Sequence, residues 1–354
     1  MILRTNISGV MERTKRFYGK DEKGSALIHV TEIKSIKKIP IKPLNQWNFH
    51  LDLKEYLDAH IQSLEQYWMN RMGVDDDLIP AISPWFGIAE HSAFVGGEVD
   101  FSSESSWHHP IIKKWSDLDR LQLREDSIWL RRVVDGMIYL KEQSNERYAV
   151  RLRGADGPMD IANALRGNDL FTDFFDYPEE VKRLMEFCSK AVEWTMSRQM
   201  KAIGPLEGGY LTGFDVWLPG KSMGHLSEDA AALCSPSIYE VFGLPYTKSL
   251  CASYDNVLMH VHSKGKHCLK LIASIPEITC IEISSDPKSP RAIEIYKAMA
   301  DQLKDKVVVV ALTKEELKEN VEFLKSVKTI IRYVAEDVDD ARNTVQYVRH
   351  HLAV

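Results

Sequence analysis

Two histidines one residue apart, His260 and His262, are the residues of this sequence best suited to hold a metal ion. They lie in a β-rich run over 257–262. Because side chains alternate faces along a strand, both imidazoles are expected to point the same way. The pair predicts a metal site, an acid–base or substrate contact, or structurally hydrogen-bonded histidines. Of these, the metal site is the most specific chemistry.

Cys280 and Glu282, in the β-rich run over 278–283, are expected to complete that site. They share one face of their strand, and neighbouring strands lie about 4.8 Å apart. Catalytic zinc commonly takes three protein ligands from histidine, cysteine and carboxylate, which leaves one position for a substrate. The sequence therefore predicts zinc as a cofactor, held by the two histidines and by Cys280 or Glu282.

Three charged residues are expected to be catalytic: Arg151 and Arg153, which end a third β-rich run, and Asp215, which ends a fourth. Arginine can bind a carboxylate or phosphate through two parallel hydrogen bonds, so the arginines could hold an anionic substrate. They could equally form internal ion pairs, with Asp156 or Asp160 as partner. Asp215 is then either a general base or the partner of one arginine.

Three further residues are expected to contact the substrate: Trp85, Trp217 and Arg332. Trp85 lies in a long stretch over 83–115 that is rich in glycine, serine and aromatic residues. Such a loop could line a large flat ligand or form a small core of its own. Trp217 follows the fourth β-rich run, and Arg332 lies on the last one.

An alternation of short β-rich runs with longer helical patterns must position these side chains. Eight strand–helix units predict an α/β fold, a single (β/α)₈ barrel domain over residues 1–354, with a long loop excursion after the second strand. An open, doubly wound sheet is the structural alternative. In a barrel, the active site lies at the carboxyl ends of the strands. The eight expected strands are 26–31, 78–82, 148–153, 210–216, 257–262, 278–283, 307–312 and 329–334.

The composition and charge of the chain argue against several classes of function and location. The 354 residues are 44% hydrophobic and carry a formal net charge of -6, which argues against nucleic-acid binding. The five cysteines lack CxxC spacing, and residues 1–20 lack the apolar region of a secretory signal. No apolar run approaches the roughly 20 residues that span a bilayer. We therefore expect reduced thiols in a cytoplasmic protein that contacts neither nucleic acid nor membrane.

Two segments resemble the uroporphyrinogen decarboxylase superfamily. The first, GPMDIANALRGNDLFTDFFDYPEEVKRLM over 157–185, is similar to its Gly-Pro turn, its Arg-Gly helix end and its D-x-P-E-x-V helix start. The second, GHLSEDAAALCSPSIYEVFGLP over 224–245, is similar to its "G-x-L-S-x-D … S-P … F … P" stretch. The resemblance implies the barrel fold, and either tetrapyrrole decarboxylation or cobalamin-dependent methyl transfer.

The sequence departs from the decarboxylases of that superfamily at three places. Their R-Q-A-G-R segment is replaced by His29-Val30-Thr31-Glu32, and their tyrosine after the Gly-Pro turn falls near Ala164. The histidine of their late G-H-G segment has no counterpart over 332–337. Residues that hold and protonate a tetrapyrrole with several carboxylates are thus missing.

The methyltransferase components of the superfamily resemble the chain better at the fifth strand. Their H-x-C-G zinc motif lines up with 260–263, with His262 in place of the cysteine. Their late cysteine near the eighth strand is missing, so Glu282 or Cys280 would have to substitute.

The leading hypothesis is metal-assisted methyl transfer between a corrinoid and a small, thiol-like acceptor. The corrinoid would be free or carried by a corrinoid-binding protein, and a homodimer is an option for the assembly. One alternative is a divergent decarboxylase of a tetrapyrrole or smaller acid that uses no metal. Another is a corrinoid- or tetrapyrrole-binding protein without catalysis.

Overall fold

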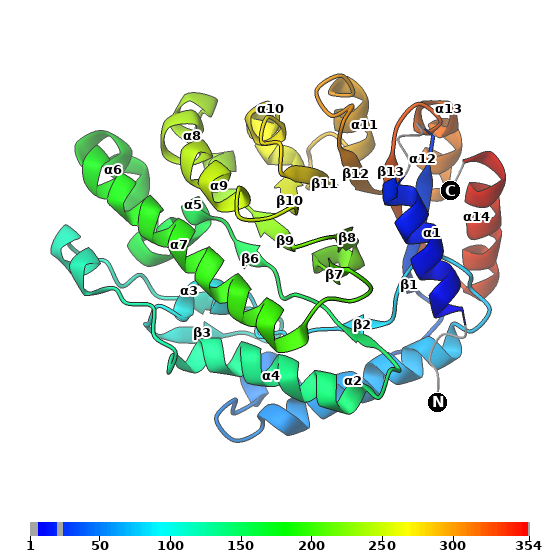
Figure 1. Ribbon diagram of the computed structural model, residues 1–354, viewed down its shortest axis with the longest axis horizontal. Helices are drawn as coiled ribbons and strands as arrows, with labels where there is room; N and C mark the ends of the chain where they lie inside the picture. Colours follow the sequence, from blue (N-terminus) through cyan, green and yellow to red (C-terminus); the bar gives the residue numbers. More distant parts are fainter. Residues whose placement is uncertain (1–5, 20–23, 353–354) are drawn as a thin grey trace.

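The computed structural model describes residues 6–19 and 24–352, and it is an α/β fold built around one parallel sheet. Figure 1 shows the strands at the centre and the helices around them. A short parallel pair, β2 (Ala81–Ile82) and β5 (Ala149–Val150), lies outside the main sheet. The order of the main sheet is β1 (Ala26–Ile33), β13 (Thr329–Ala335), β12 (Val307–Ala311), β11 (Ile278–Ser284), β10 (Asn256–His262), β9 (Ser222–Ser227) and β6 (Ala155–Asp156).

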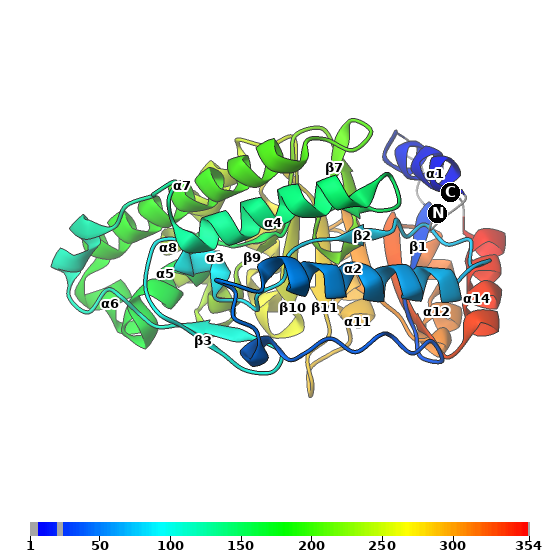
Figure 2. The ribbon, with the colours of Figure 1, turned by 90° about the horizontal axis from the view of Figure 1, so that it is seen from below.

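Long amphipathic helices cover one side of the molecule, where α4 packs between α2 and α7 (Figure 2). Helix α7 begins at Pro178 with two glutamates in its first turn and ends before Gly204, whose φ of 68° suits a helix end. The α-helices are α1 (Ile7–Gly19), α2 (Leu53–Asn70), α3 (Glu90–Ala93), α4 (Ile128–Ser144), α5 (Pro158–Arg166), α6 (Leu170–Asp176), α7 (Pro178–Ile203), α8 (Pro236–Phe242), α9 (Leu244–Cys251), α10 (Leu269–Ala273), α11 (Ala292–Ala298), α12 (Lys314–Glu319), α13 (Val321–Leu324) and α14 (Val338–His351).

The fourth parallel strand is not where the sequence predicted it. The run over 210–216 instead supplies β7 (Gly209–Leu211), which forms an antiparallel hairpin with β8 (Trp217–Pro219). Phe214 and Asp215 turn this hairpin with positive φ values of 60° and 58°. The parallel strand is β9, whose sequence SMGHLS has few β-branched residues and therefore gave no strand signal.

The closed eight-stranded barrel expected from the sequence is present only in part. Seven strands form one continuous sheet, with β1 at one edge and β6 at the other. The third expected strand, 148–153, contains only the short β5, and the strand that joins the sheet is β6, which begins two residues after that run. Strand pairing between β1 and β2 is not found among the described residues. The architecture is a parallel α/β sheet consistent with a (β/α)₈ barrel, without continuous closure by its main chain.

Two buried aspartates link β1 to the segment before β2. Asp77 Oδ2 accepts a hydrogen bond of 2.9 Å from the Ile28 amide, and Asp76 Oδ2 accepts one of 2.8 Å from the Val30 amide. Asp77 also pairs with Arg13 at 2.8 Å and with Arg349 at 2.6 Å. Side-chain carboxylates thus satisfy amides of β1 that a neighbouring strand would otherwise satisfy.

Replacing Asp77 by asparagine is expected to lower the free energy of unfolding by about 3–5 kcal/mol, because it removes a fully buried carboxylate that is the closest ion-pair partner of two partly buried arginines. Burial alone would raise the pKa of Asp77, but Arg349 and Arg13 outweigh burial and lower it. The Asp77 contribution is therefore present above the unfolded pKa of about 3.9 and is lost as the pH falls through the lower folded pKa. Urea unfolding at several pH values measures both effects. The exposed Asp75→Asn variant is the control and should lose less than about 1 kcal/mol.

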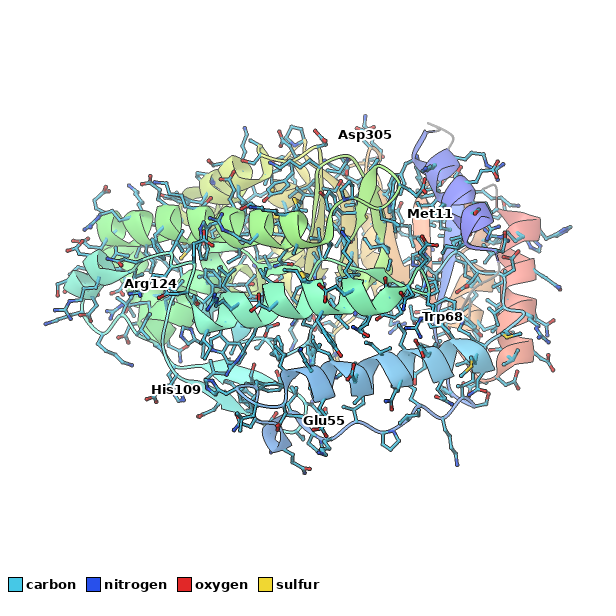
Figure 3. All side chains as sticks on the ribbon, turned by 60° about the horizontal axis from the view of Figure 1, so that its bottom comes forward. Met11, Glu55, Trp68, His109, Arg124 and Asp305 are labelled. Atoms are coloured by element: carbon cyan, nitrogen blue, oxygen red, sulfur yellow. The ribbon has the colours of Figure 1, made fainter. Side chains whose placement is uncertain are left out.

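Side chains on the inner face of the sheet change from apolar to polar along the strands. An apolar layer, which includes Leu27, Leu258 and Cys280, packs against α1 and β8. One strand step further, the inner face carries His260 and Glu282, which are in register on β10 and β11. Figure 3 shows Met11 of α1 and Asp305 on one side of the molecule and His109 on the opposite side. Helix α1 therefore covers the amino ends of the strands and leaves the carboxyl ends for the site.

The excursion between β2 and α4 contains α3, a 3-10 turn over Trp115–Arg120, and the antiparallel pair β3 (Val99–Phe101) and β4 (Ser106–His108). Its aromatic rings pack largely on one another and on neighbouring helices, as in the pairs Phe49–Phe86 and Phe101–Trp129, with ring centroids 5.0 and 5.8 Å apart. Phe49, Phe86 and Trp129 are buried members of the main hydrophobic core, and Phe101 packs against it, so the excursion does not form a separate small core. Among the helices of the described residues, none is both long and apolar enough to span a bilayer.

Candidate functional site

His260, His262 and Asp229 converge at the carboxyl ends of β9 and β10. Each offers one ligand atom, and the three atoms all lie within 4.8 Å of one another. His262 Nε2 and Asp229 Oδ2 are 3.7 Å apart. The two histidines share a face of β10, as the strand period requires, and Asp229 lies two residues after the end of β9, the neighbouring strand.

His260 is oriented by Glu282, from the next strand of the sheet. Its Nδ1–H donates a hydrogen bond of 2.5 Å to Glu282 Oε2, and Ser284 Oγ donates to the same carboxylate. Burial alone would lower the pKa of His260, but the Glu282 carboxylate outweighs burial and raises it. With Nδ1 engaged, Nε2 is the ring atom left to bind a metal ion.

His262 is oriented in the same way by Asp286, which follows β11. Its Nδ1–H donates to Asp286 Oδ1 at 2.8 Å. Asp286 Oδ2 accepts from Ser263 Oγ at 3.0 Å and from the Lys264 amide at 2.9 Å. These bonds, opposed by burial, lower the pKa of Asp286. A carboxylate behind each imidazole is the arrangement that fixes ring orientation in metal sites.

The loop that carries Asp229 is held by Asp160 of α5. Asp160 accepts hydrogen bonds from the amides of Asp229 and Ala230, at 2.9 and 2.6 Å, and from Ser227 Oγ at 3.0 Å. Burial first, and then the nearby Asp229, raise the pKa of Asp160 to about 6. Gly157 lets α5 approach, because a Cβ there would lie 2.4 Å from the Ser227 carbonyl oxygen. Helix α5 therefore fixes one side of the site.

The donor set fits zinc. Two imidazole nitrogens and one carboxylate oxygen are the three protein ligands of many catalytic zinc sites. The side chains of Asp229 and His262 are 52% and 37% exposed, so the side of the site away from His260 faces solvent. A substrate can reach a fourth coordination position from that side.

The third member of the candidate ligand group differs from the sequence prediction. Glu282 is engaged with Nδ1 of His260 and is not a member of the candidate ligand group. Cys280 lies one strand step below, in the apolar inner layer with Leu258, where burial raises the pKa of its thiol. Asp229 occupies the third position instead. It is the last residue of the G-x-L-S-x-D segment over 224–229, and this motif is the signal that could have identified it.

The two predicted arginines are paired inside the protein. Arg151 contacts Asp215 at 2.5 Å, and the buried Arg153 contacts the buried Glu90 at 2.6 Å. Arg153 also lies over the ring of Trp85, 4.2 Å from its centroid. Asp215 is therefore the partner of Arg151, and Arg153 pairs with Glu90 where Asp156 or Asp160 was expected.

The other two predicted substrate residues lie at different levels of the fold. Trp217 is buried near the amino ends of the strands, where it packs on Tyr18 and donates to the Leu206 carbonyl. Arg332 lies on the inner face of β13, 3.7 Å from Glu282 Oε1 and over the ring of Phe214. Of the two, only Arg332 lies beside the metal-ligand cluster.

Comparison with known proteins places this geometry in a family. The family model described as uroporphyrinogen decarboxylase (URO-D) matches residues 79–335. The chain belongs to the uroporphyrinogen decarboxylase family. A methyltransferase from Methanosarcina mazei has a similar fold, with a TM-score of 0.58 and 12% identity over 89% of this chain and 94% of that one. No curated protein sequence matches the chain.

In this member of the uroporphyrinogen decarboxylase family, a further histidine borders the ligand cluster. The ring centroid of His225 lies 5.6 Å from that of His260 and 4.9 Å from that of Phe214. Burial first, and then His260 and the nearby arginines, lower the pKa of His225 to about 3, so the ring is neutral. Burial also raises the pKa values of Asp156 and Glu228 well above their usual range. His225 thus adds no positive charge beside His260 at neutral pH.

Proposed function

We propose that the chain is a methyltransferase that moves a methyl group between a corrinoid and a small thiol, with zinc held by His260, His262 and Asp229. The observation that carries this proposal is the convergence of three ligand atoms, with a carboxylate on Nδ1 of each imidazole. Membership of the uroporphyrinogen decarboxylase family and the fold shared with a protein named as a methyltransferase support it.

In the proposed reaction, bound zinc would act as a Lewis acid that favours the thiolate form of the acceptor at neutral pH. The sulfur electron pair forms the new carbon–sulfur bond as the cobalt–carbon bond of the methylcorrinoid breaks. The electron pair of the broken bond stays on the corrinoid, and the thiol proton leaves to solvent. Glu282 and Asp286 keep both Nε2 atoms aimed at the site, and Asp160 keeps Asp229 in place.

The arginine pairing argues against the decarboxylase alternative. A tetrapyrrole with several carboxylates needs free cations at the mouth of the site. Arg151 and Arg153 are each neutralised by an internal carboxylate, and the Arg153–Glu90 pair is buried. Breaking a buried pair to bind a substrate carboxylate would leave Glu90 without its countercharge.

Three measurements test the proposal: the metal content of the protein, the binding of a thiol to the metal, and the turnover of methylcobalamin. We expect protein purified without chelators to hold about one zinc per chain. After exchange to Co²⁺, 2-mercaptoethanol should produce a thiolate-to-cobalt charge-transfer absorption. The corrinoid absorption spectrum monitors loss of the methyl group from methylcobalamin in the presence of that thiol, and this loss measures turnover.

A protein that takes up no metal, or a Co²⁺ spectrum that no thiol changes, would contradict the proposal. Weak turnover of free methylcobalamin, with an intact charge-transfer band, would point to a corrinoid-carrying partner protein.

A further inference from the structure

A cavity opens at the carboxyl ends of β1, β12 and β13, and Arg332 is one of its lining residues. Its volume is about 560 Å³, within the range of small-molecule sites. Four cationic side chains line it: Lys34, Arg291, Lys314 and Arg332. It is connected to the proposed zinc site through Glu282, which contacts both His260 and Arg332.

Three of the four cations have a carboxylate at hydrogen-bond distance. The pairs are Lys34–Glu336 at 2.6 Å, Lys314–Asp340 at 2.6 Å and Arg291–Glu316 at 2.7 Å. These three residues are therefore largely neutralised within the protein. They would contribute little to binding an anion.

Arg332 is different. Its ion pair within the described residues is with Glu282 at 3.7 Å, beyond hydrogen-bond distance. The Glu282 carboxylate is already taken by His260 Nδ1 at 2.5 Å and by Ser284 Oγ. Over residues 6–19 and 24–352, no hydrogen bond satisfies the Arg332 guanidinium, and its Nε is buried without a partner. An arginine has five N–H donors in a planar fork, and a buried donor left unmade is costly.

His29 adds a second buried nitrogen atom without a partner in the described part of the chain, on the strand beside Arg332. It is in register with Arg332 on the neighbouring strand β1, and its Nδ1 is buried without a partner among the described residues. Arg332 and His29 are thus side-by-side polar groups on the inner face of the sheet. A neutral imidazole can donate one hydrogen bond to an oxyanion.

We propose that Arg332, with His29 beside it, forms an oxyanion-binding subsite, so that the small substrate of this protein carries a carboxylate or phosphate group. The inference rests on the proposed function for the identity of the reacting end, which lies at the zinc site. The guanidinium fork suits either oxyanion, because both accept two parallel hydrogen bonds. Glu282 then separates the reacting end of the substrate from its anionic end.

The subsite can be tested without metal. Metal-free protein is titrated by calorimetry with inorganic phosphate and with propionate, using the wild type, Arg332→Met and Lys34→Met. We expect Arg332→Met to weaken binding of at least one anion by roughly 10- to 100-fold, as for loss of charge-assisted hydrogen bonds. Lys34→Met is the matched control, because Lys34 lines the same cavity but already has a close carboxylate, and it should bind like the wild type. Equal binding by the wild type and Arg332→Met would overturn the subsite.

A thiol series then links the subsite to the reaction. With Co²⁺ bound, the charge-transfer absorption gives affinities for 3-mercaptopropionate, 2-mercaptoethanol and cysteamine, which end in an anion, a neutral group and a cation. The wild type should prefer 3-mercaptopropionate over 2-mercaptoethanol by about tenfold or more, and Arg332→Met should lose the preference while Arg332→Lys keeps part of it. Equal affinity of the wild type for all three thiols would overturn the inference and leave the proposed function standing. If no thiol ligates the metal but anion binding still depends on Arg332, the proposed function fails and the subsite remains.

Discussion

The double substitution His260→Ala/His262→Ala is expected to abolish stoichiometric zinc binding and to slow methyl transfer by roughly 1000-fold or more. Each imidazole has one nitrogen in the candidate ligand group and Nδ1 held by a carboxylate, so the variant removes two of the three proposed ligands at once. Loss of a single group that merely orients a ligand already costs about 10–100-fold in affinity or activity. Elemental analysis and the methylcobalamin assay measure the two effects.

The control for this prediction is a second pair of histidines. His109 and His267 are exposed and lie outside the ligand cluster, so His109→Ala/His267→Ala should keep both zinc and activity. The His260 substitution also leaves Glu282 buried without its closest partner, which lowers stability. The single variant His262→Ala, at a half-exposed position, separates this effect from metal loss. A double variant that folds and keeps one zinc per chain would refute the assignment.

The shared strand face of His260 and His262 could be predicted because it depends on local periodicity alone. Strands β10 to β13 are β-branched runs bounded by turns, and their limits agree with the predicted runs to within one residue at each end. Once β10 is a strand, His260 and His262 must share a face. The family resemblance over 157–185 and 224–245 lies within the residues that the family model matches.

The misplaced fourth strand shows where local signals fail. The run over 210–216 has the composition of a strand, but two positive φ values at Phe214 and Asp215 turn it into a hairpin. The true strand β9 is rich in small and polar residues and is stabilised by pairing on both of its edges. Pairing partners are a tertiary property, which overrides strand propensity.

The arginine partners were unpredictable for a related reason. Glu90, the partner of Arg153, is 63 residues away in the sequence, inside the excursion after β2. Arg151 reaches Asp215 only because the β7–β8 hairpin returns to the end of β5. The charge of a residue and the strand face on which it lies indicate that it needs an ion-pair partner. The tertiary fold determines which residue that partner is.

If the ligand assignment is correct, three single variants are expected to differ in zinc affinity in a defined order. Asp229→Ala should weaken zinc binding by roughly 100-fold or more, because it removes a direct ligand. Glu282→Gln should cost about 10–100-fold, because it weakens the acceptor that orients His260 and raises its basicity. Cys280→Ala should leave zinc affinity within about twofold, since Cys280 lies in the apolar inner layer, although it should lower stability.

Competition with a chromophoric chelator at neutral pH gives all three affinities on one scale. The decisive comparison is between Asp229 and Cys280, because the sequence predicted Cys280 or Glu282 as the third ligand and the geometry favours the aspartate. If Cys280→Ala lost zinc while Asp229→Ala kept it, the inner face of β11 would have to rearrange around the metal. A loss confined to Asp229 and Glu282 would instead mean that β9, β10 and β11 hold the ligands as they lie, with one carboxylate as ligand and the other as the group that aims the imidazole.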